Sequence, residues 1–321
     1  MNMIEEKEKA HIGQTDIPVI MAPMFLVSSP QSVIEACKAR IIGTFPLLNA
    51  RTSEELEKWF ETIQKALDPQ RNHPSAPLSP WGVNLIVHKT NKRLDADLEA
   101  IRKYEPPIVI TSLGNPQAVV EIVHQYGGVV LSDVISIKHA QKAAKSGVDG
   151  LILVCNGAGG HGGTLNPFAF VPEVRKFWKG LTIVAGCISN GQDIVAVQAL
   201  GADFAYMGTR FIAAEETMAN DVYKEMLIEA TSEDIIYTDA ISGVNGNYLI
   251  PSIVNAGLNL ENLQKKSDFN TGWRENEPKA WKNIWGAGQG VGEIMEIEPI
   301  GKIVETLKEE YFQALDQLKK F

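Results

Sequence analysis

The residues best suited to chemistry are one histidine and the five glycines around it, in the segment Cys155-Asn156-Gly157-Ala158-Gly159-Gly160-His161-Gly162-Gly163. The segment follows an apolar run, residues 151–154, that is typical of a buried strand. Glycine lets a backbone approach a ligand closely, and histidine exchanges a proton nearest neutral pH. Among the six histidines, only His161 has glycines on both sides after an apolar strand. We therefore interpret His161 as a base presented to a bound cofactor or substrate, and not as an incidental residue of a plain turn.

Glycines also follow the apolar runs at residues 182–185 and 204–207, as Gly186 and Gly208. Both would expose backbone N–H groups, and Thr209 adds a hydroxyl that can cap the next turn. The loops after the seventh and eighth strands of a barrel commonly bind phosphate. The pair therefore favours a phosphate site, although compact turns with glycine for packing would use the same residues.

Other polar residues have two interpretations each. Asn84 lies inside the apolar run at residues 82–87, where it is either a satisfied core amide or a partner for the edge of a heteroaromatic ring. Cys155 and Cys187 lie beside the glycine loops, and small apolar packing is favoured over a reactive thiol for both.

The histidine loop also fits the pattern G-x-G-x-x-G, a weak signal for dinucleotide binding. Three features count against a dinucleotide fold. The motif follows the sixth strand, Asn166-Pro167 is expected to interrupt any helix after it, and no acidic residue closes the strand at residues 182–185.

Composition excludes several classes of protein. The chain of 321 residues has a net charge of −9, which argues against a nucleic-acid binder. Its three cysteines show no C-x-x-C spacing, so neither a disulfide framework nor a metal site is expected. No apolar signal core or run of membrane-spanning length is present. We expect a cytoplasmic protein with no membrane partner, and a homodimer is compatible with the sequence.

Short apolar strands alternate with amphipathic helices along the first two thirds of the chain. Strands are predicted at residues 18–22, 41–45, 82–87, 108–112, 129–132, 150–154, 182–185 and 204–207. Helices are predicted at residues 30–39, 53–67, 91–104, 116–126, 136–146, 170–178, 191–200, 217–230 and 299–318. Continuous apolar strands are typical of parallel sheets buried on both faces. The alternation predicts an α/β fold, the (β/α)₈ TIM barrel, with a doubly wound open sheet as the alternative.

The alternation ends after residue 212, and a polar stretch rich in glycine and tryptophan follows. We expect residues 1–231 and 293–321 to form the barrel with its terminal helix. Residues 232–292 are expected to be an insertion that covers the barrel mouth, not an independent domain. Residues 68–80, rich in proline, are expected to form a loop.

Taken together, several segments resemble the nitronate monooxygenase family, formerly called 2-nitropropane dioxygenases. They are Ala22-Pro23-Met24, Val83-Asn84-Leu85, Ala158-Gly159-Gly160-His161-Gly162-Gly163, Val184-Ala185-Gly186 with Asn190-Gly191, and Met207-Gly208-Thr209-Arg210-Phe211 after Gly201-Ala202-Asp203. Ala240-Ile241-Ser242-Gly243 and Ala287-Gly288-Gln289-Gly290-Val291-Gly292 are also similar to the family. The resemblance covers most of the chain, and the ordered Gly-Gly-His and Met-Gly-Thr-Arg-Phe motifs are fairly specific.

The resemblance implies a TIM barrel that binds FMN non-covalently and oxidises alkyl nitronates with O₂ to a carbonyl product and nitrite. It implies that His161 is the catalytic base for a small-molecule substrate. The cofactor-binding residues that it implies are Ala22, Pro23, Met24, Asn84, Lys138, Gly159, Gly160, Gly163, Gly186, Met207, Gly208 and Thr209. Asp133 and Lys138 follow the fifth strand, where they would orient the flavin or cap the barrel.

The chain departs from the family pattern at three positions of the flavin and substrate face. Gly157 stands where many members have Glu, Val154 stands where many have Gln, and Cys187 replaces a second glycine. The related FMN-dependent enoyl-[acyl-carrier-protein] reductases, which use NADH, share the fold and the histidine loop, and residues 110–116 look somewhat like them. The same motifs are compatible with NADH:quinone reductases of the superfamily and with a flavin-binding scaffold that has no activity.

Overall fold

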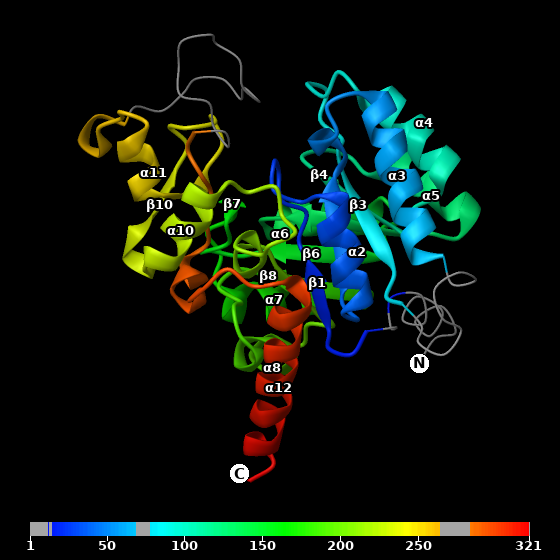
Figure 1. Ribbon diagram of the computed structural model, residues 1–321. Coiled ribbons are helices and arrows are strands. Elements are labelled where there is room, and N and C mark those ends of the chain that lie inside the picture. Colours follow the sequence, from blue (N-terminus) through cyan, green and yellow to red (C-terminus); the bar gives the residue numbers. More distant parts are fainter. Residues whose placement is uncertain (1–11, 13–14, 69–77, 264–282, 321) are drawn as a thin grey trace.

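Eight parallel strands close into a barrel in the computed structural model, which describes residues 12, 15–68, 78–263 and 283–320. Figure 1 shows the barrel with its surrounding helices. Its strands, in order around the ring, are β1 (Val19–Met21), β2 (Ile42–Pro46), β3 (Trp81–Ile86), β4 (Ile108–Ser112), β5 (Val129–Val134), β6 (Gly150–Val154), β8 (Leu181–Ala185) and β9 (Phe204–Met207). β9 pairs with β1, so the predicted TIM barrel is confirmed and the open sheet is wrong.

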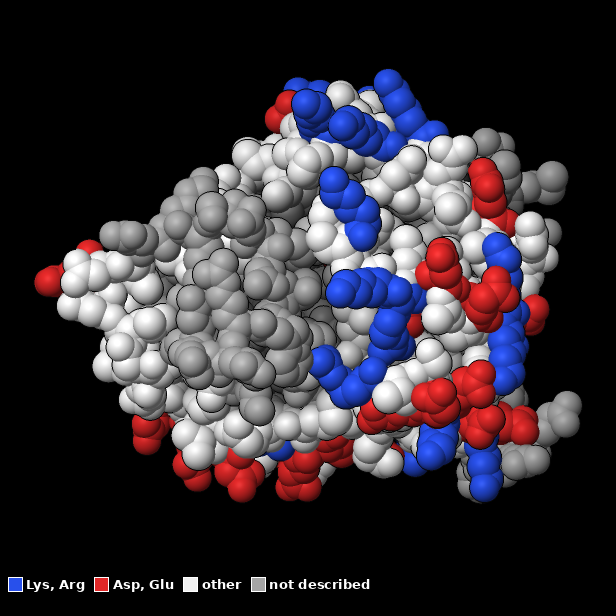
Figure 2. All heavy atoms as spheres, turned by 90° about the horizontal axis from the view of Figure 1, so that it is seen from above, with Lys and Arg blue, Asp and Glu red and all other residues white. Residues whose placement is uncertain are grey.

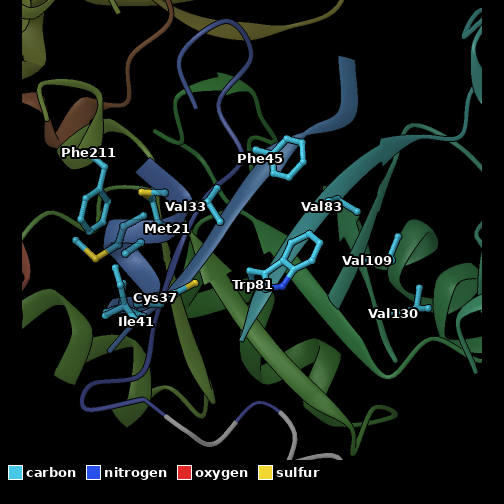
Figure 3. Packing of buried hydrophobic residues seen from close by; sticks show 14 of the residues in the cluster. Met21, Val33, Cys37, Ile41, Phe45, Trp81, Val83, Val109, Val130 and Phe211 are labelled. Atoms are coloured by element: carbon cyan, nitrogen blue, oxygen red, sulfur yellow. The ribbon is translucent and has the colours of Figure 1, made fainter. Parts of the chain in front are cut away.

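Successive side chains of a barrel strand point to opposite faces of the sheet, so they enter two hydrophobic cores in turn. Residues such as Ile20, Ile110 and Ile152 fill the barrel interior. The residues next to them in the sequence point outward and pack between the strands and the surrounding helices. Figure 3 shows part of this shell, with Met21 and Phe45 from the strands near Val33 of α2. Burial on both faces explains why the strands are apolar throughout.

A helix follows each barrel strand. These helices are α2 (Pro30–Lys38), α3 (Ser53–Leu67), α4 (Leu94–Tyr104), α5 (Gln117–Val123), α6 (Ile137–Lys145), α7 (Pro167–Arg175), α8 (Gly191–Ala199) and α9 (Thr209–Ile212), with short 3₁₀ turns η1 (Leu47–Asn49) and η2 (His124–Tyr126). After the barrel come α10 (Asp221–Glu229) and the terminal α12 (Ile300–Leu318). Polar caps fix several starts, as Ser136 does by accepting a hydrogen bond from the His139 amide.

Helix α7 corrects one expectation. The pair Asn166-Pro167, expected to interrupt a helix, begins one. The Asn166 side chain accepts a hydrogen bond from the Phe168 amide at 2.9 Å, and Pro167 occupies the first helical position, where no backbone N–H is needed. The helix predicted at residues 170–178 therefore starts earlier. Two others start later, at Leu94 and Asp221, because the residues before them form turns and caps.

The insertion pairs with the histidine loop. Its described elements are η3 (Ser232–Asp234), β10 (Ile235–Thr238), β11 (Gly246–Leu249), α11 (Ile250–Asn255), η4 (Leu260–Asn262) and η5 (Gln289–Glu293). β11 pairs antiparallel with β10 on one side and with β7 (Gly160–His161) on the other. Residues 264–282 of the predicted insertion, and 69–77 of the predicted loop, lie outside the described residues. Within the described ranges, every helix is too short or too polar to span a bilayer.

Two aspartates at the starts of strands tie the barrel's lower rim together. Asp149, before β6, accepts a hydrogen bond from the Val130 amide of β5 at 2.7 Å. Asp203, before β9, accepts one from the Thr182 amide of β8 at 2.9 Å and pairs with Arg175 of α7 at 3.0 Å. The turns Gly147-Val148-Asp149 and Gly201-Ala202-Asp203, which are similar in sequence, therefore have the same function, which is to hold the adjacent strand in register.

We predict that Asp203→Ala lowers the free energy of unfolding by about 1–3 kcal/mol, because the buried Thr182 amide loses a charged acceptor. Denaturant unfolding should show a lower midpoint with an unchanged slope. Asp316→Ala, which removes an exposed carboxylate of α12, is the control and should leave the midpoint unchanged. Equal midpoints for the Asp203 variant and the unsubstituted protein would contradict the assignment.

Candidate active site

A cavity of about 990 Å³ lies at the carboxyl ends of the barrel strands. Loops after the barrel strands and residues of the insertion, among them Ser242 and Gly288, line it. The predicted site residues that line it are Ala22, Pro23, Met24, Asn84, Gly159, Gly160, His161, Gly186, Gly208 and Thr209. The fold therefore brings residues from five separate loops and strands to one cavity.

The other three predicted cofactor residues do not line the cavity. Met207 is buried in the shell between strands and helices. Gly163 lies behind the histidine loop, where a Cβ atom would come within 2.7 Å of the Val154 carbonyl oxygen. Lys138 lies on α6 outside the cavity, whereas Lys142, one turn farther along the helix, does line it.

His161 is held by the insertion rather than by its own loop. As part of β7 it pairs with Gly246 of β11, and its Nε2 atom lies 2.9 Å from the Ser242 Oγ atom. Ser242 Oγ donates to the Val244 carbonyl at 3.1 Å and lies 2.9 Å from the Tyr248 hydroxyl. Because a serine hydroxyl has one proton and the carbonyl can only accept, Ser242 accepts from His161 Nε2–H. This assignment places the imidazole lone pair on Nδ1.

Burial lowers the pKa of His161 to about 4, so the imidazole is neutral at neutral pH. The surface that this partly buried side chain keeps faces the cavity. A neutral imidazole can accept a proton from a substrate. The resulting cation is costly in this setting unless an anion forms next to it.

A chain of hydrogen bonds forms the cavity floor at the top of the barrel interior. Asn84 Nδ2 donates to Ser112 Oγ at 2.7 Å, and Ser112 Oγ donates to Asp133 Oδ2 at 2.5 Å. Burial raises the pKa of Asp133 to about 6, and burial together with the nearby Asp133 carboxyl raises the pKa of Tyr206. Asn84 is thus a hydrogen-bonded barrel residue that also lines the cavity, so its two interpretations are compatible.

The glycines after β8 and β9 differ in what they allow. Gly186 has φ +123°, and a Cβ atom would lie 2.8 Å from the Asn156 carbonyl oxygen, so this turn requires glycine. A Cβ atom added at Gly208 would meet no atom closer than 3.6 Å, which is ordinary van der Waals contact. A side chain there would occupy the cavity wall beside Met24 and Thr209. The absence of a side chain at Gly208 therefore leaves a recess for a ligand.

Two departures from the family pattern are neighbours in space. A Cβ atom on Gly157, whose φ is +76°, would lie 2.3 Å from Cys187 Sγ and 2.9 Å from Gln289 Oε1. Cys187 itself has φ +53°, a conformation that favours glycine. The side chain of Cys187 thus fills the space that a larger residue at position 157 would need. Cys155 is buried, and burial raises the pKa of its thiol to about 12.

Sequence reasoning did not assign several site residues that the insertion supplies. Ser242 contacts His161 and Tyr248 contacts Ser242, while Gly288 lines the cavity beside Thr209 and Gly290 lines it beside Ser189. The Gly288 amide donates to Thr209 Oγ1 at 2.9 Å. The motifs around Ser242 and Gly288 are visible in the sequence, but pairing across about eighty residues is not. Among the described residues, no cluster of His, Cys, Asp or Glu could hold a metal ion.

We predict that the His161 imidazole titrates at about pH 4 and is protonated on Nε2 when neutral, because it is buried and donates to Ser242. Two-dimensional ¹⁵N–¹H NMR of protein labelled in histidine measures both properties, and His161→Asn assigns the signal. Ser242→Ala should weaken the preference for Nε2–H. A midpoint near the unperturbed value of about 6.5 would contradict the burial argument.

Comparisons with known proteins identify a family. The family model described as "Nitronate monooxygenase" matches residues 60–310. The chain is similar to nitronate monooxygenases from Paraburkholderia phytofirmans, at 24% identity over 95% of both chains, and Neurospora crassa, at 23% over 94% of this chain and 91% of that one.

Solved structures share the fold. Nitroalkane oxidase from Streptomyces ansochromogenes has a TM-score of 0.80 at 22% identity, covering 95% of this chain and 99% of that one. FabK from Thermotoga maritima has a TM-score of 0.78 at 24% identity, covering 97% of each chain. Because the family model spans most of the barrel and the histidine loop, this chain belongs to the nitronate monooxygenase family and is an oxidoreductase.

Proposed function

We propose that this protein binds FMN and catalyses the oxidative denitrification of alkyl nitronates, using O₂ and giving a carbonyl product and nitrite. One observation carries the proposal: His161, Asn84 and the glycines after β8 and β9 line the same cavity. One cavity thus offers a base for the substrate, and a polar contact and a glycine recess for the cofactor. Enzymes of this family are in general flavin-dependent.

The residues present fit a flavin phosphate. Gly208 leaves a recess that a Cβ atom would fill, and Gly186 and Thr209 line the cavity beside it. These residues would hold the phosphate, and Asn84 would contact the ring edge from the floor. When bound, FMN supplies the electron acceptor for the oxidation. A cavity of about 990 Å³ is at the upper end for small-molecule sites, which leaves room for a substrate.

His161 would act on substrates that still carry their acidic proton. A neutral nitroalkane must lose a C–H proton to become a nitronate, and the neutral imidazole can accept it. Burial disfavours the imidazolium until the nitronate anion forms beside it, so proton transfer and charge pairing are coupled. Ser242 and β11 hold the ring in place. The insertion residues Val244 and Asn245 line the same cavity.

We predict that the purified protein is yellow and shows the absorbance bands of oxidised flavin. Gly208→Leu should weaken FMN binding by at least about tenfold, because the side chain would fill the recess. Fluorescence quenching of added FMN measures the affinity. Gly301→Leu is the control, since a side chain there meets no atom within 4 Å. A colourless protein that gains no flavin spectrum on addition of FMN would refute the cofactor assignment.

We predict that His161→Asn abolishes activity on neutral nitroalkanes while FMN stays bound. A positioned base contributes about 10²–10⁴-fold to such a step. Activity on pre-formed nitronates should fall much less, because their proton is already lost. Nitrite release and oxygen consumption measure both reactions. Equal losses on the two substrates with FMN retained would make His161 a binding residue, and loss of FMN would make it structural.

An FMN- and NADH-dependent enoyl reductase is the second candidate, favoured by the segment after β4. Residues Ser112, Leu113, Gly114, Asn115 and Pro116, which resemble that family, all line the cavity. NADH separates the two functions. Rapid anaerobic bleaching of the flavin by NADH, reversed by a crotonyl thioester, would favour the reductase. Bleaching by a nitronate with nitrite release would favour the denitrification.

A further inference from the structure

The cavity continues beyond the reacting residues into a groove beside α6. We define the α6 groove by Asn115, His139, Lys142, Lys145 and Ser146, all of which line the cavity. None of them has a place in the proposed denitrification. A small nitroalkane at His161 would leave this part of the cavity without an occupant.

One face of α6 is turned toward the groove. His139, Lys142, Ala143 and Ser146 line the cavity, and their spacing of three and four residues places them on one side of the helix. At a rise of about 1.5 Å per residue, the groove follows α6 for roughly 9 Å between His139 and Lys145. The residues that line the groove are therefore spread along the helix, as the binding of an extended chain requires.

The far end of the groove is positioned by a polar contact. Asn115 Oδ1 accepts a hydrogen bond from Ser146 Oγ at 3.2 Å and another from the Gln117 amide at 3.1 Å. These bonds join the loop after β4 to the end of α6. The Asn115 oxygen accepts both of these hydrogen bonds, so the NH₂ group of the same side chain is left as a donor. This NH₂ group adds one donor to the end of the groove.

The charge of the groove is positive, in contrast to the chain as a whole. The protein has a net charge of −9, yet Lys142 and Lys145 line the groove and form no ion pair within the described part of the chain. Among the described residues that line the cavity, Asp133 is the one acidic residue, and it lies in the floor, bonded to Ser112. Figure 2 shows Lys and Arg side chains bordering the centre of this face, with many Asp and Glu side chains toward its edges.

The groove and the glycine recess are built from different loops of the barrel mouth. Asn115 follows β4 and α6 follows β5, the fourth and fifth strands of the ring, whereas Gly186 and Gly208 follow β8 and β9, the seventh and eighth. A cofactor phosphate held by Gly186 and Gly208 would not use the residues of the groove. The groove is therefore available to the substrate.

We infer that the α6 groove binds a phosphate group at the end of an extended substrate whose reacting carbon lies at His161. The inference rests on the proposed function, since it names the substrate class of the same site. Two ammonium groups and the Asn115 NH₂ group can donate here, which suits a tetrahedral dianion with several oxygens better than a carboxylate with two. The natural substrate is then a long phosphorylated molecule, not a small nitroalkane.

Steady-state kinetics test the inference with two matched substrates. The nitronate of ω-nitrohexyl phosphate is compared with the nitronate of the neutral ω-nitrohexyl methyl ether. The phosphate should have a kcat/KM at least about tenfold higher, mainly through a lower KM, because a charge-assisted contact forms away from the reacting atoms. Equal kcat/KM values for the two nitronates would overturn the inference.

Charge reversal locates the contact. Lys142→Glu should remove the preference for the phosphate, measured as the ratio of kcat/KM for the phosphate to kcat/KM for the neutral ether. Lys145→Glu should reduce the preference in the same direction. Lys65→Glu on α3, an exposed lysine that does not line the cavity, changes the net charge equally and should keep the preference. The inference would be overturned if the Lys142→Glu and Lys145→Glu variants kept the preference for the phosphate. It would also be overturned if the Lys65→Glu variant lost the preference to the same extent.

A binding measurement separates this inference from the proposed function. If no nitronate is oxidised, the proposed function fails, and calorimetry on the flavin-loaded protein still tests the groove. Hexyl phosphate should bind at least about tenfold more tightly than hexanol, and Lys142→Glu should remove the difference. Hexyl phosphate that binds no better than hexanol, or equally well to the Lys142 variant, would overturn the inference whatever the reaction is.

Discussion

Closure of the barrel by pairing β9 with β1 is the constraint on which the site depends. Val19, Ile20 and Met21 pair in register with Ala205, Tyr206 and Met207, so the parallel sheet has no open edge. All eight strands then end at the same rim, and the loops after them converge there. The interior isoleucines exclude water below that rim. Residues as distant in the chain as Asn84 and Gly208 therefore line one cavity.

The insertion supplies rigidity that the histidine loop lacks by itself. A loop with five glycines has many accessible conformations, and fixing a side chain on it costs conformational entropy. Pairing with β11 fixes Gly160 and His161, and Asn247 Nδ2 donates to the Ala158 carbonyl at 2.7 Å. The Gln289 amide donates to the Gly157 carbonyl at 2.9 Å. The insertion thus holds the loop from two sides, as a defined base position requires.

The departures from the family pattern are compensated locally. Cys187 adopts a left-handed conformation that costs roughly 1–2 kcal/mol for a residue with a Cβ atom. Its side chain occupies the space beside Gly157, and Gln289 occupies the rest. A larger residue at position 157 would require both neighbours to move. The three residues therefore form one unit, and a change at one of them alone would be strained.

The sequence by itself determined the barrel, because burial on both faces demands continuous apolar strands such as residues 150–154, and these are visible locally. It also singled out His161, Asn84 and Gly208, which line the cavity, because polar or glycine residues at the ends of apolar strands are uncommon. Only the tertiary structure decided that Ser242 orients His161, that Cys187 fills the space beside Gly157 and that α6 turns Lys142 into the cavity. These contacts join residues far apart in the chain. Their geometry depends on strand pairing and helix rotation, which local composition does not encode.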